Sequence, residues 1–178
     1  TLSLLVASTI VGLLPPKVEH PVMKVNTVQL KSVGAKITCD SCNTQERMAL
    51  EAFQKRGITD KYALATLMGN IKQESLFKAD ICEGGARVPY EQCFSGGYGL
   101  IQWTTANRYR GLGNFCQKYD CNPSTTEGQL RYLFNEYQWT RSEYVFKTPG
   151  QSIDWYMSKG AYPWLGWGVH GNRTVYAH

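Results

Sequence analysis

The sequence lacks a dense run of basic residues, and its net charge is small. Lys and Arg number 19 against 14 Asp and Glu, a formal net charge of +5, and they are scattered along the chain. Proteins that bind nucleic acid usually gather such charges into a patch, so we expect no nucleic-acid partner. A weak positive charge would equally well attract the protein to another anionic polymer, such as a bacterial cell wall. Charge alone therefore does not decide the class of function.

The sequence also lacks the ligands that a zinc site needs. Cys39 and Cys42 have the right spacing, but no second pair accompanies them and the three histidines lie far away, so we expect no metal and no cofactor. Six cysteines in close neighbour pairs favour local disulfides and an oxidising location, although other connectivities are open. The neighbour pairs are Cys39 and Cys42, Cys82 and Cys93, and Cys116 and Cys121.

Two segments precede the part of the chain that has a globular pattern. Residues 1–14 are almost wholly apolar and end at Pro15-Pro16. They are shorter than the ~20 apolar residues that cross a bilayer. We expect residues 1–16 to dock into another protein of an assembly, with a membrane anchor through the same apolar run as the alternative. Residues 17–42 are expected to form an extended arm, and residues 43–178 the compact domain.

From residue 43 onward the sequence predicts mostly helix. Asn43 and Glu46 form a capping box that predicts a helix to about Arg56. Thr59 or Asp60 is expected to cap a second helix, in which apolar residues recur at helical spacing along one buried face. The expected fold class is mainly α (α+β), a helical domain with a small β-hairpin lobe.

Further elements follow from turn and cap signals. Residues 80–100 contain glycines, a proline and two cysteines, which favours a loop or a small β-hairpin. Helices are expected over residues 104–119, 125–138 and 149–159, the last with Thr148 as its cap.

Glu74 is the principal candidate for chemistry. It lies three residues beyond Ile71, at the end of the second predicted helix and on or next to its buried face. Burial and the dipole of a helix C-terminus both disfavour the charged carboxylate, so its protonated form is favoured. A carboxylic acid of this kind can protonate a glycosidic oxygen. A Glu-Ser pair at a helix end is more often an exposed terminus, so Glu74 alone is a weak signal.

A second segment strengthens the signal. Residues 98–104 read YGLIQWT and follow a glycine-rich stretch. Aromatic, amide and small residues of this kind line sugar grooves, which makes Tyr98 and Gln102 candidates for substrate contact. Trp103 is the tryptophan best placed to stack on a sugar, although most tryptophans belong to the core or its edge.

Three segments in this order together resemble the phage tail lysozyme family, within the lysozyme-like superfamily of peptidoglycan glycosidases and lytic transglycosylases. They are residues 68–75, 98–104 and 129–136. The resemblance covers about residues 43–178 and is loose over 164–177. It implies a helical fold with a small β-lobe, Glu74 as general acid, and Tyr98 and Gln102 in the cleft.

The resemblance also implies a substrate and a location. The expected reaction is cleavage of the bond between N-acetylmuramic acid and N-acetylglucosamine in bacterial peptidoglycan, with Asp80, Glu83 and Glu91 as candidates for a second carboxylate. The alternatives are a lytic transglycosylase acting on the same bond and a virion structural protein that binds peptidoglycan without cutting it. The expected place is the phage tail or baseplate, acting in the host periplasm or cell wall, with other virion proteins contacted through residues 1–16.

Overall fold

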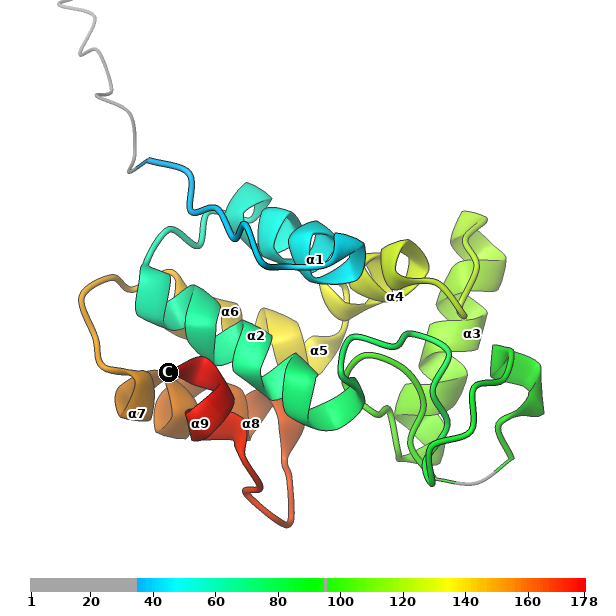
Figure 1. Cartoon of the computed structure of the whole chain (residues 1–178). Helices are drawn as coiled ribbons and strands as arrows, with labels where there is room; N and C mark the ends of the chain where they lie inside the picture. Colours follow the sequence, from blue (N-terminus) through cyan, green and yellow to red (C-terminus); the bar gives the residue numbers. More distant parts are fainter. Residues whose placement is uncertain (1–34, 95) are drawn as a thin grey trace, which may run out of the picture. The chain divides into compact units, whose positions relative to one another are not determined.

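The computed structural model describes residues 35–94 and 96–178, which form a mainly α-helical domain (Figure 1). The predicted segment 1–16 and most of the predicted arm 17–42 lie outside the described residues. No helix in the described part is both long and apolar enough to cross a membrane. The elements are α1 (Thr44–Lys55), α2 (Lys61–Ser75), the 3₁₀ turn η1 (Tyr90–Gln92), α3 (Ala106–Tyr119), α4 (Thr126–Leu133), α5 (Tyr137–Thr140), α6 (Glu143–Phe146), α7 (Ile153–Tyr156), the π-helical turn η2 (Met157–Ala161), α8 (Tyr162–Leu165) and α9 (Arg173–Ala177).

The first two helices begin where the sequence predicts. The Glu46 N–H donates to Asn43 Oδ1 at 2.9 Å, and the Glu46 carboxylate accepts from the Asn43 N–H at 2.8 Å, which completes the capping box of α1. Asp60 Oδ1 accepts from the N–H of Tyr62 at 2.8 Å and so caps α2. After α1 the chain turns at Gly57, whose φ of +88° suits glycine. Both predicted helix starts are confirmed.

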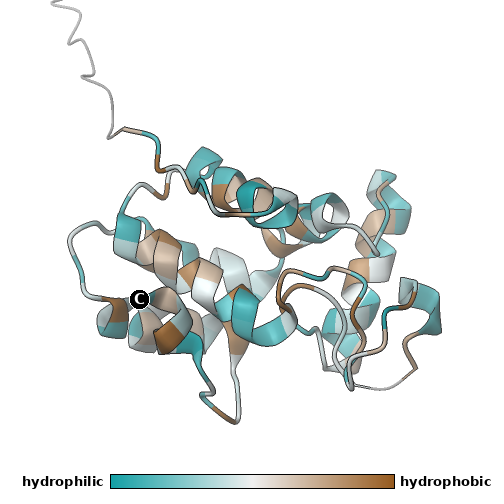
Figure 2. Ribbon diagram, in the orientation of Figure 1, coloured by the Kyte–Doolittle hydropathy of each residue, from teal (hydrophilic) through white to brown (hydrophobic). Residues whose placement is uncertain are grey.

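Helix α2 supplies much of the core. Leu67 and Ile71 of α2 are fully buried, as is Phe53 of α1. In Figure 2 hydrophobic and hydrophilic residues alternate around both helices, as expected for helices that bury one face. Trp139 joins this core, with its ring centroid 5.5 Å from that of Phe53 and 5.2 Å from that of Trp164. The core therefore holds α2 firmly from its capped start toward its C-terminal end.

The last helix, α9, lies directly against α2 (Figure 1). Gly69 makes this close approach possible, because a side-chain carbon there would lie 2.7 Å from the backbone nitrogen of Ala177 and 2.9 Å from the carbonyl oxygen of Arg173. The chain before α9 is also tied to α2, since Gln73 Oε1 accepts from the Asn172 N–H at 2.8 Å. This packing brings Arg173 beside the end of α2.

The helix predicted over residues 149–159 begins later than expected. Gly150 has a φ of +81°, which no α-helix contains, and its N–H donates to Asp60 Oδ2 at 2.8 Å. Ser152, rather than Thr148, caps α7 by accepting from the N–H three residues later. The predicted start was wrong because it was based on local capping residues alone. The bond from Gly150 to Asp60 joins residues far apart in the sequence, and a local pattern cannot show it.

The helix predicted over residues 125–138 is interrupted. α4 ends at Leu133, and Glu136 has an extended backbone before α5 begins. The Glu136 side chain is buried and accepts hydrogen bonds from Arg108 Nη2 at 2.8 Å and from Trp103 Nε1 at 3.2 Å. The break in the helix thus places a carboxylate in the core, where a buried charge needs paired donors.

All three predicted disulfides are present: Cys39–Cys42, Cys82–Cys93 and Cys116–Cys121. No cysteine of the described residues is free. The bridge at Cys82 and Cys93 closes the segment between α2 and α3. In place of a full hairpin this segment has two isolated β-bridges in the described residues, Ile81 with Arg87 and Cys82 with Tyr98.

Replacing Cys82 and Cys93 together by alanine is expected to lower the free energy of unfolding by roughly 2–3 kcal/mol, because the bridge restricts the unfolded chain over a sequence separation of 11 residues. Urea unfolding of the full chain would measure the change. The matched control replaces Cys39 and Cys42, whose bridge spans a separation of only 3 residues and should contribute less. Equal stability of the Cys82/Cys93 variant and the parent would contradict the expectation.

Candidate active site

The structure brings the two sequence segments together at the C-terminal end of α2. Ser75 Oγ donates to the carbonyl oxygen of Leu100 at 2.9 Å, which ties the helix end to the following turn. Within that turn the Trp103 N–H donates to the Tyr98 carbonyl oxygen at 3.0 Å. Glu74, the neighbour of Ser75, therefore lies at the junction of α2 and the 98–103 turn.

The Glu74 carboxyl is paired with a buried arginine from α9. Arg173 Nη2 donates to Glu74 Oε1, and the two side chains are 5% and 16% exposed, respectively. Burial raises the pKa of Glu74 above its ordinary value of about 4.5, and this effect outweighs the opposing attraction of Arg173 and Arg108. Glu74 therefore keeps its proton at a higher pH than an exposed glutamate does.

Arg173 is held on both sides. Its guanidinium carbon lies 4.7 Å from the ring centroid of Trp167, a distance at which a cation and an aromatic ring attract each other. Burial lowers the pKa of Arg173, and the Glu74 carboxylate acts against that shift. Sequence reasoning did not find this residue, because a single arginine 99 residues after Glu74 carries no local signal of contact.

Gln129 is a second residue whose role the sequence did not reveal. Its side chain is fully buried, and its Oε1 accepts from the Leu100 N–H at 2.8 Å. Its Nε2 donates to the carbonyl oxygens of Ala79 at 2.6 Å and Pro123 at 2.8 Å. Gly99 has a φ of +74°, and a side-chain carbon there would lie 2.4 Å from Gln129 Oε1. Gln129 thus fixes the turn beside Glu74 to two other loops.

Replacing Gln129 by leucine is expected to lower the free energy of unfolding by at least about 2 kcal/mol, because it leaves one buried N–H and two carbonyl oxygens without their partner. Urea unfolding followed by circular dichroism would measure the loss. Gln117→Leu on α3 is the matched control, since Gln117 is exposed. The same stability in both variants would contradict the structural role of Gln129.

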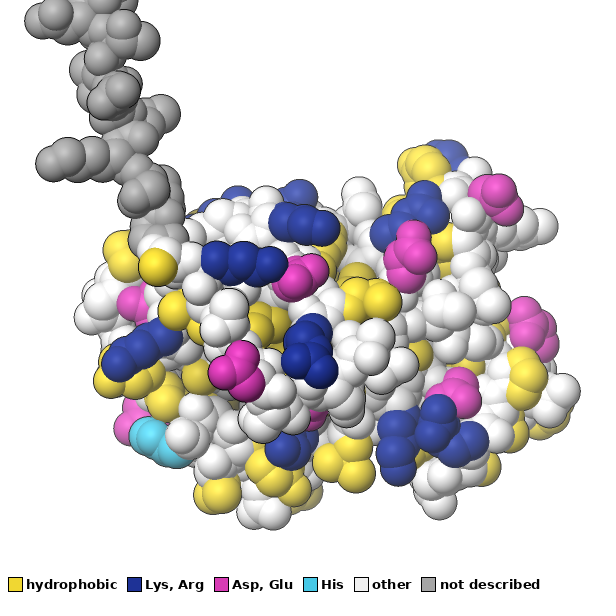
Figure 3. Space-filling view, turned by 45° about the horizontal axis from the view of Figure 1, so that its top comes forward, with side chains coloured by type: hydrophobic (Ala, Val, Ile, Leu, Met, Phe, Trp, Pro, Cys, Tyr) yellow, Lys and Arg dark blue, Asp and Glu magenta, His cyan; other side chains and the backbone are white. Residues whose placement is uncertain are grey.

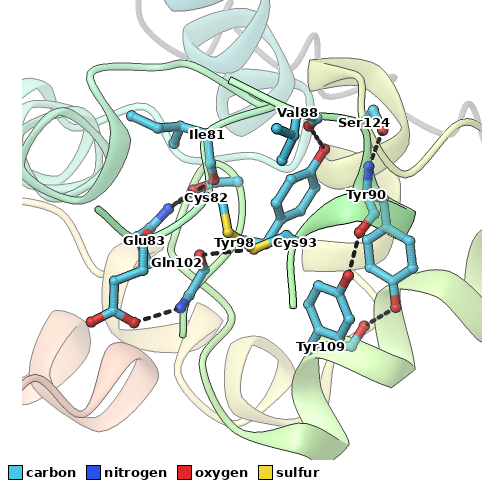
Figure 4. Close-up of a disulfide and its surroundings, with 12 residues drawn as sticks. Ile81, Cys82, Glu83, Val88, Tyr90, Cys93, Tyr98, Gln102, Tyr109 and Ser124 are labelled. Atoms are coloured by element: carbon cyan, nitrogen blue, oxygen red, sulfur yellow. Dashed lines mark hydrogen bonds between the residues drawn. A yellow bond between two sulfur atoms is a disulfide. The ribbon is translucent and has the colours of Figure 1, made fainter. Parts of the chain in front are cut away.

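Tyr98 and Trp103 hold the turn from inside. Both side chains are fully buried. Figure 4 shows Tyr98 beside the stacked rings of Tyr90 and Tyr109, with its hydroxyl donating to a backbone carbonyl. Trp103 donates its indole N–H to Glu136. The expectation that these two residues contact a sugar is corrected accordingly, because a buried ring has no exposed face on which a sugar can stack.

Gln102 is held in a strained backbone conformation. Its φ is +51°, which is uncommon for a residue with a side chain and is found more often at functional sites. Its Nε2 donates to the carbonyl oxygens of Gly99 at 3.0 Å and Ile81 at 3.3 Å. The side chain is only partly buried, so it remains the residue of this turn best suited to meet a substrate.

The three candidate carboxylates lie in different surroundings. Glu83 Oε2 accepts from the Gly97 N–H at 2.8 Å, which places it against the loop that leads to Gln102 (Figure 4). Asp80 pairs with Arg87, and both line a groove of about 620 Å³ together with Glu91. The charged neighbours that shift the pKa of Glu74 are Arg173 and Arg108. Asp80, Glu83 and Glu91 are not among them.

Charge is not concentrated on the face of the molecule shown in Figure 3, where Lys and Arg side chains are interspersed with Asp and Glu. Among the described residues no group of three His, Cys, Asp or Glu side chains is arranged to hold a metal ion. The distinctive chemical group is Glu74, a largely buried carboxyl with a raised pKa and a cationic partner, Arg173. Such a group can act as a general acid.

Comparison with known proteins identifies the family. The sequence profile described as phage tail lysozyme matches residues 44–161, more than half of the chain. No curated protein and no solved structure matches. The matched region contains Glu74, Gln102 and Gln129, whereas Arg173 lies beyond it. The match supports a lysozyme-type, peptidoglycan-degrading function. The chain belongs to the phage tail lysozyme family.

Proposed function

We propose that the protein cleaves the bond between N-acetylmuramic acid and N-acetylglucosamine in peptidoglycan, with Glu74 as the general acid. The observation that carries the proposal is the burial of the Glu74 carboxyl at the end of α2, which raises its pKa. A glycosidase needs a carboxylic acid that is still protonated when it meets the leaving oxygen. The family match supplies the class of substrate.

Arg173 determines how Glu74 would deliver its proton. A guanidinium group only donates hydrogen bonds, so the oxygen that faces it, Oε1, acts as an acceptor. The proton of the neutral acid then belongs on Oε2, the oxygen that we propose faces the glycosidic oxygen. After transfer the carboxylate is negative, and the fixed positive charge of Arg173 stabilises it without rearrangement. Gln102, from the adjoining turn, is proposed to position the sugar.

The second half of the reaction has two candidate routes. In the first, Glu83 assists a water molecule or attacks the sugar itself; it is chosen over Asp80 and Glu91 because it lies against the loop leading to Gln102. In the second, a hydroxyl of the muramic acid attacks, as in a lytic transglycosylase. The second route needs no second carboxylate.

We further propose that the protein is carried on the phage tail or baseplate and acts in the host periplasm or cell wall. The family name and the three disulfides, which persist outside a reducing cytosol, support this location. Residues 1–16 are proposed to dock into another tail protein, with membrane association as the alternative. Deleting them should leave cleavage intact and abolish co-assembly with virion proteins, whereas binding of the intact chain only to lipid vesicles would favour the membrane.

Release of muropeptides from purified peptidoglycan by the full chain, with mass analysis of the product ends, tests the reaction. Reducing muramic acid ends would establish hydrolysis of the proposed bond, and anhydromuramic ends the transglycosylase route. Reducing N-acetylglucosamine ends would contradict the bond assignment. Binding to peptidoglycan without any release of soluble fragments would contradict an enzymatic role altogether.

A further inference from the structure

A pocket of about 390 Å³ lies next to the arginine that pairs with Glu74. Two contacts connect Glu74 with the pocket. Glu74 is paired with Arg173, and the Arg173 guanidinium lies over the ring of Trp167, which lines the pocket. Its walls combine aromatic and polar side chains. The aromatic ones are Tyr162, Trp167 and His170, and the polar ones include Asp154, Ser158 and Thr174.

The aromatic wall is built in a fixed geometry. Tyr162 meets Trp167 edge-on with ring centroids 5.2 Å apart, and His170 meets it edge-on at 5.8 Å. His170 is held in turn by a hydrogen bond of 2.9 Å between its Nε2 and Thr174 Oγ1. Tyr162 is 54% exposed although it belongs to this cluster. A pre-arranged aromatic surface that stays open to solvent has little ordering entropy to lose when a ligand packs on it.

The polar groups around this wall define the kind of ligand. Asp154 and Ser158 are exposed. The Ser158 hydroxyl donates to the Trp155 carbonyl oxygen at 3.2 Å, so its oxygen and the Asp154 carboxylate can accept hydrogen bonds from hydroxyl or amide groups of a ligand. No Lys or Arg is among the described residues that line the pocket, and the nearby Arg173 is paired with Glu74, so the lining does not favour an anionic ligand. An apolar wall with a few polar groups beside it suits a neutral, amphiphilic ring.

We propose that this pocket binds an N-acetylated sugar of a glycan, at a site that adjoins Glu74 but does not include it. The apolar face of the sugar ring and its acetyl methyl group pack on Trp167 and Tyr162, and its hydroxyl groups bond to Asp154 and Ser158. The choice of ligand rests on the proposed function, because that function makes glycan the substrate. The aromatic wall and Thr174 lie beyond residues 44–161, whereas Asp154, Met157 and Ser158 lie within them, so the pocket extends the site past the family match.

The test uses the full chain carrying Glu74→Gln, so that the sugar probe is not cleaved. Tri-N-acetylchitotriose is titrated in, and the indole N–H signals of the tryptophans and the imidazole signals of the histidines are followed by NMR. We expect saturable shifts at Trp167 and His170. Adding Tyr162→Ala should weaken binding about tenfold, or about 1.4 kcal/mol. Adding Tyr144→Ala, a 70% exposed tyrosine on α6 that does not line the pocket, should leave binding unchanged.

The outcomes separate this inference from the proposed function. Sugar-dependent shifts confined to the 98–103 turn, with Trp167 and His170 unmoved, would overturn the pocket assignment. So would shifts of Trp167 produced by a peptidoglycan stem peptide and not by the sugar. Saturable binding at Trp167 together with a parent chain that releases no muropeptides would uphold the pocket and defeat the proposed reaction.

Discussion

Replacing Glu74 by glutamine is expected to reduce the rate of peptidoglycan cleavage by ~10²–10⁴-fold, because the amide keeps the shape of the side chain but has no acidic proton to transfer. The amide oxygen can still accept from Arg173, so the fold and binding to the cell wall should be retained. Muropeptide release per unit time measures the effect. Glu51→Gln is the matched control, since Glu51 is an exposed glutamate of α1 far from the turn in sequence, and it should leave the rate unchanged.

The parent enzyme should show a matching dependence on pH. The proposed general acid, Glu74, would act only when protonated, so the rate should fall as the pH rises through the pKa of Glu74. Burial raises that pKa, so the fall should occur above the ordinary value of about 4.5. The Glu74→Gln variant should lose this limb of the pH profile. Cleavage by the variant at the parent's rate would show that another residue supplies the proton.

The parts of the fold that the sequence predicted correctly depend on residues close to one another in the chain. Asn43 and Glu46 are three residues apart, so the capping box that starts α1 is visible in the sequence and present in the structure. The cysteine pairs are also neighbours, and Cys82 and Cys93 bond across a short loop. In both cases the partner lies within reach of a short stretch of chain, so local pattern and spacing are sufficient.

The parts that were missed depend on contacts between distant residues. Trp103 has the sequence setting of a sugar-stacking residue, yet it is buried, and its indole N–H donates to Glu136, 33 residues later. Gln129 lies in a segment whose apolar residues suggest only packing, and its role depends on Leu100 and Ala79. The two segments beside Glu74 could be recognised, but the residues that hold them in place could not.

Replacing Arg173 by methionine is expected to lower the free energy of unfolding at neutral pH by ~3–5 kcal/mol, the usual cost of removing one partner from a buried ion pair. Methionine keeps much of the length of the arginine stem and its packing on Trp167, so lost charge should dominate the change. Without the guanidinium, burial acts on Glu74 with less opposition, and the pKa of its carboxyl in the folded state rises further.

The sign of the pH dependence follows from that rise. A folded state with a raised pKa binds the proton of Glu74 more tightly than the unfolded chain does. The stability that comes from this tighter proton binding is fully present at pH values below about 4.5, the ordinary pKa of a glutamate. It is lost as the pH rises through the pKa of Glu74 in the folded state. The deficit of Arg173→Met relative to the parent should therefore be small in acid and grow toward neutral pH. Urea unfolding across this range measures it.

The same substitution should move the falling limb of the pH–rate profile to higher pH, because Glu74 then keeps its proton longer. Arg173→Lys preserves a positive charge and should fall between the parent and Arg173→Met. The double variant Glu74→Gln, Arg173→Met removes both charges, so it should lose less stability than the sum of the two single variants.

A deficit for Arg173→Met that is equal in acid and at neutral pH, with an unmoved rate profile, would show that Arg173 serves only to pack α9 against α2. A deficit that grows with pH and a shifted limb would instead make Arg173 a positioning residue, one that controls the proton of Glu74 from outside the region shared with the family.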